Sequence, residues 1–283
     1  MGVKVPIIDF RKSSEWEKGS EKWVLVRDEV YKSLEEFGCF EALLDEDIPK
    51  EKLYDKLKEV YNFNLEKKFG HSVSPDVKIG YTNDVMITYS KKVTEFNDIV
   101  RRMVFDKLGL KEYYLDEHKK SGDPFVVLIK YRVPEDGEKN IGVPPHTDKV
   151  ISIVLSQHDM NINGLQIMEK NGQWIDVQYS KPYSYIFLVG DYLKAFTNGR
   201  LRCPLHQVII GNEERYTVGL PIFPKEGHII KVPEELVDED HPLLYKPFDG
   251  SKYLPFYLSE LKRGVVATLE SYCGVSADTP NLC

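Results

Sequence analysis

The stretch that decides the fold runs from residue 142 to residue 155 and reads GVPPHTDKVISIVL. Its second half is an apolar, β-branched run that is typical of a strand, and His146 and Asp148 stand at the mouth of that strand. Residues i and i+2 of an extended segment point to the same side, so both side chains can reach one ion without a bend in the backbone. The pair is a candidate metal site on a β-sheet.

A third metal donor is His206, which lies far downstream, just before the apolar residues 208 to 210. A barrel or jelly roll would bring these two strands together. Two imidazoles and one carboxylate can occupy one face of an octahedral Fe(II) and leave the other face open for a chelating co-substrate and dioxygen. An H-x-D tripeptide alone marks a metal in roughly one case in ten, because a single His beside a strand is more often a core or surface residue.

A candidate carboxylate receptor follows in residues 214 to 220, which read ERYTVGL. The alternation of this run puts Arg215 and Thr217 on one face of a strand, and a guanidinium fork with a hydroxyl binds both oxygens of a carboxylate. Beside the metal donors, this receptor suits a 2-oxo acid that chelates iron with its keto-acid end and anchors its distal carboxylate on Arg215. A surface Arg that caps a strand is the simpler alternative, but it does not explain the coincidence.

The chain changes character along its length. Helical spacing of apolar residues predicts helices over residues 21 to 36, after residue 49 and over residues 95 to 108, while the polar stretch from 72 to 90 predicts a loop. From Phe125 onward, short apolar runs alternate with Gly, Asn, Asp and Pro, and Asn171-Gly172 predicts a tight hairpin. A last helix is expected near residues 264 to 272. These patterns predict a mainly β fold with N-terminal helices.

Several short motifs occur in a specific order: VPIIDF at 5 to 10, EFGCF at 36 to 40, GLQI at 164 to 167, GQW at 172 to 174, GD at 190 to 191 and NGR at 198 to 200. With them the chain resembles the plant 2-oxoglutarate- and Fe(II)-dependent dioxygenase superfamily over nearly its whole length. The segments PKEG at 224 to 227, PEELVD at 233 to 238 and KPF at 246 to 248 look most like its glucosinolate-side-chain and auxin-oxidising subgroup.

The resemblance implies a role for each candidate residue. Carried over by position, His146, Asp148 and His206 would be the iron ligands, Arg215 and Thr217 would hold the distal carboxylate of 2-oxoglutarate, and Tyr131 would lie near the co-substrate. It also implies a double-stranded β-helix (jelly-roll) core. We expect one integrated catalytic unit in three parts: an N-terminal helical region over 1–121, the Fe(II)/2-oxoglutarate core over 122–230, and a C-terminal wrap and helix over 231–283.

The implied activity is a dioxygen-consuming oxidation of a small specialised metabolite or hormone, by hydroxylation, desaturation or oxidative cyclisation. Tyr81, Phe223 and Phe256 are the candidate substrate contacts. The chain departs from the family pattern in having Thr217 for Ser, Gln207 for Arg, KYRVP for NYYP at 130 to 134, and a shortened stretch between residues 80 and 93. The shortened stretch and Gln207 leave open a metal-retaining, non-oxidative isomerase, cyclase or lyase. A scaffold that only binds small molecules has no evident use for four intact site residues.

Composition narrows the choice of partners. The chain has 283 residues and a net charge of −7 without a basic face, which argues against nucleic acid and anionic membranes as partners. The four cysteines lack metal or disulfide spacing, and no leader or long apolar span is evident, so a reduced, cytoplasmic protein is expected. We expect a monomer that acts on a small molecule.

Overall fold

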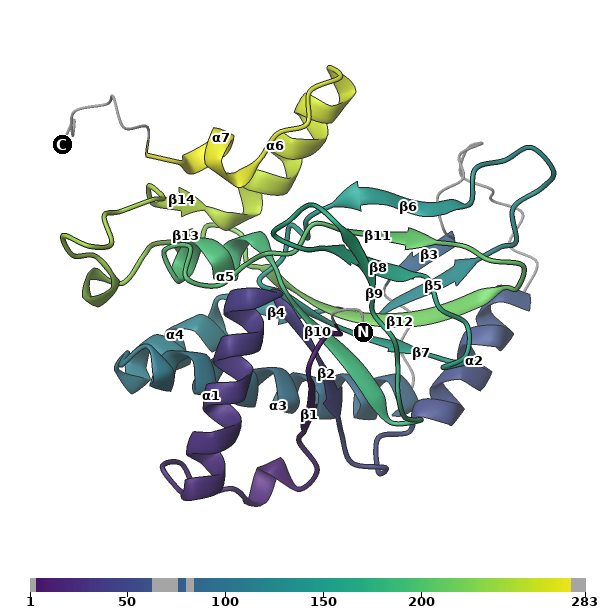
Figure 1. Ribbon diagram of the computed structural model, residues 1–283, viewed down its shortest axis with the longest axis horizontal. Coiled ribbons are helices and arrows are strands. Elements are labelled where there is room, and N and C mark those ends of the chain that lie inside the picture. Colours follow the sequence, from purple (N-terminus) through teal and green to yellow (C-terminus); the bar gives the residue numbers. More distant parts are fainter. Residues whose placement is uncertain (1–3, 63–75, 80–83, 276–283) are drawn as a thin grey trace.

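The strands form two facing β-sheets in the computed structural model, which describes residues 4 to 62, 76 to 79 and 84 to 275. The larger sheet takes strands from both halves of the chain, and the smaller sheet takes them from residues 141 to 209. Figure 1 shows the smaller sheet above the larger one, with long helices along the opposite side of the larger sheet. A layered arrangement of this kind lets the larger sheet bury one face against the helices and turn the other face toward the smaller sheet.

The strands of the larger sheet pair in the order β1 (Ile7–Asp9), β2 (Cys39–Leu43), β10 (Ser184–Val189), β7 (Ser152–Gln157), β12 (Arg215–Pro224), β5 (Val127–Tyr131) and β3 (Asp76–Ile79), and β4 (Gly122–Pro124) also pairs with β12. Every residue of β10 is buried. The centre of the hydrophobic core therefore lies at β10 and its two neighbours, where a continuous apolar run is expected for a strand covered on both faces.

The strands of the smaller sheet pair in the order β6 (Ile141–His146), β11 (His206–Ile209), β8 (Leu165–Met168) and β9 (Trp174–Asp176). The expected hairpin joins β8 to β9, and Gly172 in its turn has a φ of +84°, a conformation that glycine adopts without strain. β6 is at one edge of this sheet and pairs only with β11 among the described strands. A short ribbon of β13 (Ile229–Ile230) and β14 (Phe248–Asp249) follows.

Two long helices pack beneath the larger sheet. α1 (Glu21–Glu36) begins at Ser20, whose side chain accepts a hydrogen bond from the Trp23 amide at 3.2 Å, as an N-cap should. α3 (Asp84–Lys107) crosses the sheet and packs against α1 (Figure 1). A stripe of its buried residues recurs every three or four positions: Met86, Tyr89, Val93, Phe96, Val100 and Met103.

The helices at residues 21 to 36 and after residue 49 are confirmed, the latter as α2 (Lys50–Asn62). The helix expected from residue 95 begins instead at Asp84, because the apolar spacing of α3 continues back through a polar stretch. β3 also falls within the stretch that was expected to be a loop. α4 (Glu112–Lys120) was not expected, and the last helix is a pair, α6 (Gly250–Lys262) and α7 (Leu269–Cys273). The fold is therefore a mixture of helices and sheets, and its helix content is higher than that of the mainly β fold predicted from the sequence.

Two further expectations concern the chemistry of the whole chain. Cys39, Cys203 and Cys273 are free and buried, in agreement with the expected free thiols, and Cys283 lies outside the described residues. Within the ranges that the structure describes, no helix is both long enough and apolar enough to cross a membrane.

Candidate active site

The three metal-donor side chains meet where β6 pairs with β11. His146 and His206 are direct partners in the antiparallel register, and their ring centroids are 4.2 Å apart. Asp148 follows β6 by two residues and turns its carboxylate between them, with Oδ1 3.6 Å from His146 Nε2 and Oδ2 3.6 Å from His206 Nε2. The donor atoms all lie within 4.8 Å of one another. One ion can therefore contact all three.

Backbone carbonyls fix the orientation of both imidazole rings. His146 Nδ1 lies 2.9 Å from the Pro144 carbonyl and His206 Nδ1 lies 3.2 Å from the Pro204 carbonyl. A carbonyl only accepts, so each Nδ1 carries a proton, and in the neutral ring the lone pair is on Nε2, which faces Asp148. This is the tautomer that a divalent metal needs.

The protonation state of the site also suits a metal. Burial opposes ionisation of Asp148, but His206, His146 and Lys149 outweigh it and lower the Asp148 pKa to about 2. Burial lowers the pKa of His206 below its ordinary value, despite the attraction of Asp148. At neutral pH Asp148 is therefore charged, and the lowered pKa of His206 favours its uncharged, metal-binding form. At His146 the effect of burial is outweighed by Asp148, which raises the His146 pKa.

A second set of contacts holds the turn that follows β6. The Asp191 carboxylate, at the start of α5 (Asp191–Phe196), accepts hydrogen bonds from the Thr147 and Tyr253 hydroxyls at 3.1 Å each and lies 3.2 Å from the Lys149 ammonium. The Asp191 amide donates to the Asp148 carbonyl at 2.9 Å. Asp191 therefore positions the residues on either side of the metal donor Asp148.

Arg215 is the strongest candidate for a co-substrate anchor. It is 2% exposed, and its Nε donates to Gln157 Oε1 at 2.7 Å while its guanidinium lies 5.0 Å from the Tyr131 ring centroid. Arg215 Nη1 and Thr217 Oγ1 are buried and have no hydrogen-bond partner among the described residues. Two unpartnered donors on one face of β12 fit a carboxylate, because buried polar groups are otherwise paired.

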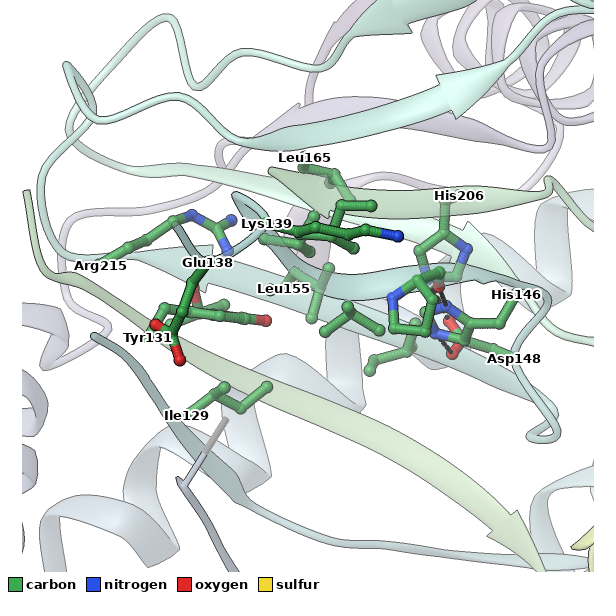
Figure 2. A pocket seen from close by; sticks show the side chains of 17 residues that line it. Ile129, Tyr131, Glu138, Lys139, His146, Asp148, Leu155, Leu165, His206 and Arg215 are labelled. Carbon is green, nitrogen blue, oxygen red and sulfur yellow. Dashed lines mark hydrogen bonds and ion pairs between the residues drawn. The ribbon is translucent and has the colours of Figure 1, made fainter. Parts of the chain in front are cut away.

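The metal donors and the carboxylate receptor share one cavity of about 850 Å³ between the two sheets. Figure 2 shows Arg215 and Tyr131 toward one end and His146, Asp148 and His206 toward the other. Thr217 also lines this cavity. Most of the remaining wall is aliphatic and comes from both sheets: Ile129, Ile141, Val143, Ile153, Leu155, Leu165 and Val208.

The proposed substrate contacts are not brought to this cavity. Phe223 lines a separate, smaller hollow with Phe125, because it lies eight residues beyond Arg215 along β12, about 25 Å at the rise of a strand. Phe256 lies on α6 and packs on Tyr272, with ring centroids 4.9 Å apart. Tyr81 lies outside the described residues.

The sequence interpretation missed some of the residues that shape the site. Gln157 orients Arg215, and its own amide is fixed by donating to the carbonyls of Asp159 and Ile162. The alternation of β7 gives a signal for Gln157, because a polar residue stands at the end of an apolar strand. Gln207, treated as a departure that weakens the site, donates instead to Gln166 Oε1 at 2.9 Å and does not line the cavity.

The site and its position between two sheets define a non-haem iron enzyme that uses a 2-oxo acid. Residues 122 to 224 match the family model described as the 2OG-Fe(II) oxygenase superfamily. The chain is 34% identical over 315 residues to the probable 2-oxoglutarate-dependent dioxygenase AOP1.2 of Arabidopsis thaliana, with 96% of each chain covered. It belongs to the 2OG-Fe(II) oxygenase superfamily, and is an oxidoreductase with Fe(II) and 2-oxoglutarate as cofactor and co-substrate.

Solved structures share the fold at lower identity. The rice dioxygenase for auxin oxidation matches with a TM-score of 0.75 and 20% identity, over 96% of this chain and 100% of the other. JOX2 in complex with 2OG, Fe and JA matches with a TM-score of 0.73 and 17% identity, over 90% and 85%.

The alignment with AOP1.2 runs over 315 residues, more than the 283 residues of this chain. That relative therefore has residues with no counterpart here. Their location between residues 80 and 93 stays a prediction.

Proposed function

We propose that the protein oxidises a small specialised metabolite or hormone, with consumption of 2-oxoglutarate and dioxygen. The observation that carries this proposal is the presence of three metal donors and an unpartnered Arg215–Thr217 receptor in a single cavity. When bound, the iron and the 2-oxo acid supply dioxygen activation with release of succinate and carbon dioxide. The jelly-roll topology and the three-part division of the chain at residues 121 and 230 belong to the same proposal.

In this proposal the residues that bind iron and 2-oxoglutarate have separate tasks. His146, Asp148 and His206 hold Fe(II), and their fixed rings and ionised carboxylate support that role. Arg215 and Thr217 bind the distal carboxylate of 2-oxoglutarate. Tyr131 supports the guanidinium from one face, so that the fork keeps its direction.

A small substrate is supported by the cavity and by the relatives. About 850 Å³ of largely aliphatic space accommodates a co-substrate together with a small, mostly apolar molecule. The titles of the solved structures name auxin oxidation for the rice enzyme and a complex with JA for JOX2. We infer that a compound of comparable size is hydroxylated, desaturated or cyclised here.

The non-oxidative alternative, an isomerase, cyclase or lyase, rested on the shortened stretch and on Gln207. Because Gln207 pairs with Gln166 away from the cavity, it gives that alternative no support. The oxidative proposal predicts strict dependence on both dioxygen and 2-oxoglutarate.

Anaerobic titration with Fe(II), with and without 2-oxoglutarate, tests the proposal by way of the weak visible charge-transfer band of the chelate. Air is then admitted and succinate is measured with a panel of plant hormones and specialised metabolites. A band that needs both components, and succinate that rises with a panel member, is the expected result. Asp148→Ala is the control and should give neither. Conversion of a substrate without dioxygen or 2-oxoglutarate would favour the non-oxidative alternative.

A further inference from the structure

The loop between β5 and β6 forms one wall of the cavity and is held in a fixed shape. Arg132 grips the Glu138 carboxylate with two hydrogen bonds, of 2.7 Å from Nη1 and 2.8 Å from Nη2. The Glu135 amide donates to the same carboxylate at 2.7 Å. Arg132 and the Glu135 amide lower the Glu138 pKa to about 2. Glu138 is therefore ionised at neutral pH and paired with Arg132.

Lys139 comes next, and its other neighbour is also fixed, because the Asn140 carbonyl accepts a hydrogen bond from the Ile210 amide at 2.7 Å. Lys139 lines the cavity, and Figure 2 shows its side chain reaching along it, with the ammonium on the side where His206 lies. Throughout the described part of the chain, no residue forms an ion pair or hydrogen bond with this ammonium. A lysine whose two chain neighbours are held by hydrogen bonds thus reaches from an exposed loop into the cavity.

The other charges of the cavity wall are accounted for. Asp148 belongs to the metal donors, Glu138 is paired with Arg132, and Arg215 faces the opposite end with the unpartnered Thr217 hydroxyl. Among the described residues that line the cavity, Lys139 is the cation without an assigned task. The wall around it is aliphatic, so a ligand that satisfies both features has an apolar body and one anionic group.

We propose that Lys139 binds the carboxylate of the oxidised substrate, and that the substrates of this enzyme are small apolar carboxylic acids. The proposal rests on the proposed function. A lysine ammonium is a compact point charge on a flexible stem, so it can follow carboxylates attached to bodies of different shape. Lys139 thereby holds the substrate carboxylate on the side of the cavity where His206 lies and sets which neighbouring carbon faces the metal donors.

Matched pairs of probes test the assignment without turnover. Phenylacetate and phenylacetamide, naphthylacetate and naphthylacetamide, and cinnamate and cinnamamide are titrated calorimetrically into the anaerobic Fe(II) enzyme with saturating 2-oxoglutarate. Each pair keeps shape and apolar area and differs in charge. The expected result is a roughly fivefold tighter Kd for the carboxylates, the size of a partly exposed ion pair.

Lys139→Met should abolish this preference, and Lys139→Arg should retain it. Lys170→Met is the matched control, because Lys170 is an exposed lysine in the β8–β9 turn that does not line the cavity. It should leave the preference unchanged. Lys139 is itself exposed, so none of these changes removes a buried contact.

Three outcomes would overturn the assignment. A carboxylate preference that survives in Lys139→Met would place the anion elsewhere. Failure of every carboxylate to bind the wild-type enzyme would exclude the substrate class. A weaker 2-oxoglutarate Kd in Lys139→Met, with unchanged probe binding, would assign Lys139 to the co-substrate. Failure of the proposed function is distinguishable, because it is a wild-type protein without the charge-transfer band or succinate release.

Discussion

Thr217 keeps a buried hydroxyl without a hydrogen-bond partner among the described residues, beside the equally unpartnered Arg215 Nη1. An unmade hydrogen bond of a buried group costs about 1 to 3 kcal/mol, so the ligand-free protein is less stable than its packing allows. The two atoms lie in the cavity wall, where a bound carboxylate would complete both. The unpaired Arg215 and Thr217 groups therefore lower the stability of the ligand-free protein and raise its affinity for a carboxylate.

Thr217→Val tests this exchange, because valine keeps the shape and β-branching of threonine and removes the hydroxyl. We expect the free energy of unfolding of the ligand-free protein to rise by about 1 kcal/mol, while the affinity for 2-oxoglutarate falls about tenfold. Urea unfolding and titration of the charge-transfer band measure the two effects. Thr217→Ser should keep most of the affinity, and a variant that loses stability and affinity together would show a packing role instead.

Arg215 depends on Gln157 for its direction, since Gln157 Oε1 accepts from Nε and Nη1 is left without a partner among the described residues. Arg215→Lys should raise the KM for 2-oxoglutarate by roughly ten- to a hundredfold, because a lysine cannot grip both carboxylate oxygens. Gln157→Leu should raise it less, by roughly threefold to tenfold. Steady-state succinate release at varied 2-oxoglutarate gives both values. An unchanged KM in Arg215→Lys would contradict the anchor assignment.

The candidate site residues that the sequence predicted are those whose side-chain chemistry and spacing suggest a role without knowledge of their neighbours in the fold. His146, Asp148, His206, Arg215 and Thr217 combine metal-binding or carboxylate-binding groups with strand spacing. The role of Gln157 follows from a partner 58 residues away, and that of Lys139 follows from the pairing of its neighbours. Neither of these contacts produces a pattern in the neighbouring sequence from which it could be predicted.

The turn between β6 and β7 is held from outside by α5. Asp191 compensates the Lys149 ammonium, which is 9% exposed, and accepts from the Thr147 hydroxyl. Gly190 allows this approach, since a Cβ there would lie 1.9 Å from the Val150 carbonyl oxygen. The short helix therefore sets the position of Asp148 through its first residue.

Asp191→Ala should weaken Fe(II) binding by about ten- to a hundredfold, as is usual when a group that orients a metal ligand is lost. It should also destabilise the protein by roughly 3 kcal/mol, because Lys149 is left buried without its counter-charge. Anaerobic iron titration and urea unfolding measure these effects. Asp191→Asn keeps an acceptor for Thr147, so its iron affinity should lie between those of wild type and Asp191→Ala. Equal iron affinity in all three proteins would show that α5 does not position the metal ligand Asp148.

The helices that were not predicted from the sequence are those whose local sequence does not favour a helix and whose tertiary contacts stabilise one. α6 contains Pro255, which breaks a helical pattern when read alone, and α4 is mostly polar. The first turns of α3 follow a stretch with Pro75 and Gly80. For α4 and α6, packing against α3 and β12 respectively stabilises a helix that local propensity alone does not favour.

The molecule as a whole contains a buried cation whose effect on stability depends on pH. Lys50, at the start of α2, is 6% exposed and donates to the Pro182 carbonyl. Burial lowers its pKa to about 8, although Glu41 and Glu51 act in the opposite direction. The unfolded chain binds this proton more tightly, so the cost of burying the charge is full below pH 8 and disappears as pH rises toward 10.5.

Lys50→Met should therefore raise the free energy of unfolding near neutral pH by roughly 1 to 3 kcal/mol, and the gain should shrink as pH rises above 8. Urea unfolding of both proteins at about pH 7 and about pH 9.5 measures the difference. Lys194→Met is the opposite control, because Glu270 raises the Lys194 pKa and the variant should lose stability at neutral pH. A gain that does not vary with pH would mean that packing, rather than charge, decides the effect.

At the scale of the whole fold, the sequence predicted the kinds of elements but not which distant strands pair with one another. Facing strands and N-terminal helices follow from apolar periodicity. The pairing order β6-β11-β8-β9 and the parallel contact of β1 with β2 depend on contacts across the entire chain, which one sequence does not specify.

The direct pairing of His146 with His206 makes the metal site a cross-link as well as a reaction centre. β6 is an edge strand with one described neighbour, and its register with β11 shifts immediately beyond the two histidines. An ion held by both strands closes a long loop in the way that a disulfide does, so that iron uptake protects the edge. Amide exchange along β6 should slow when iron is added, while β10 in the buried core stays protected in both states.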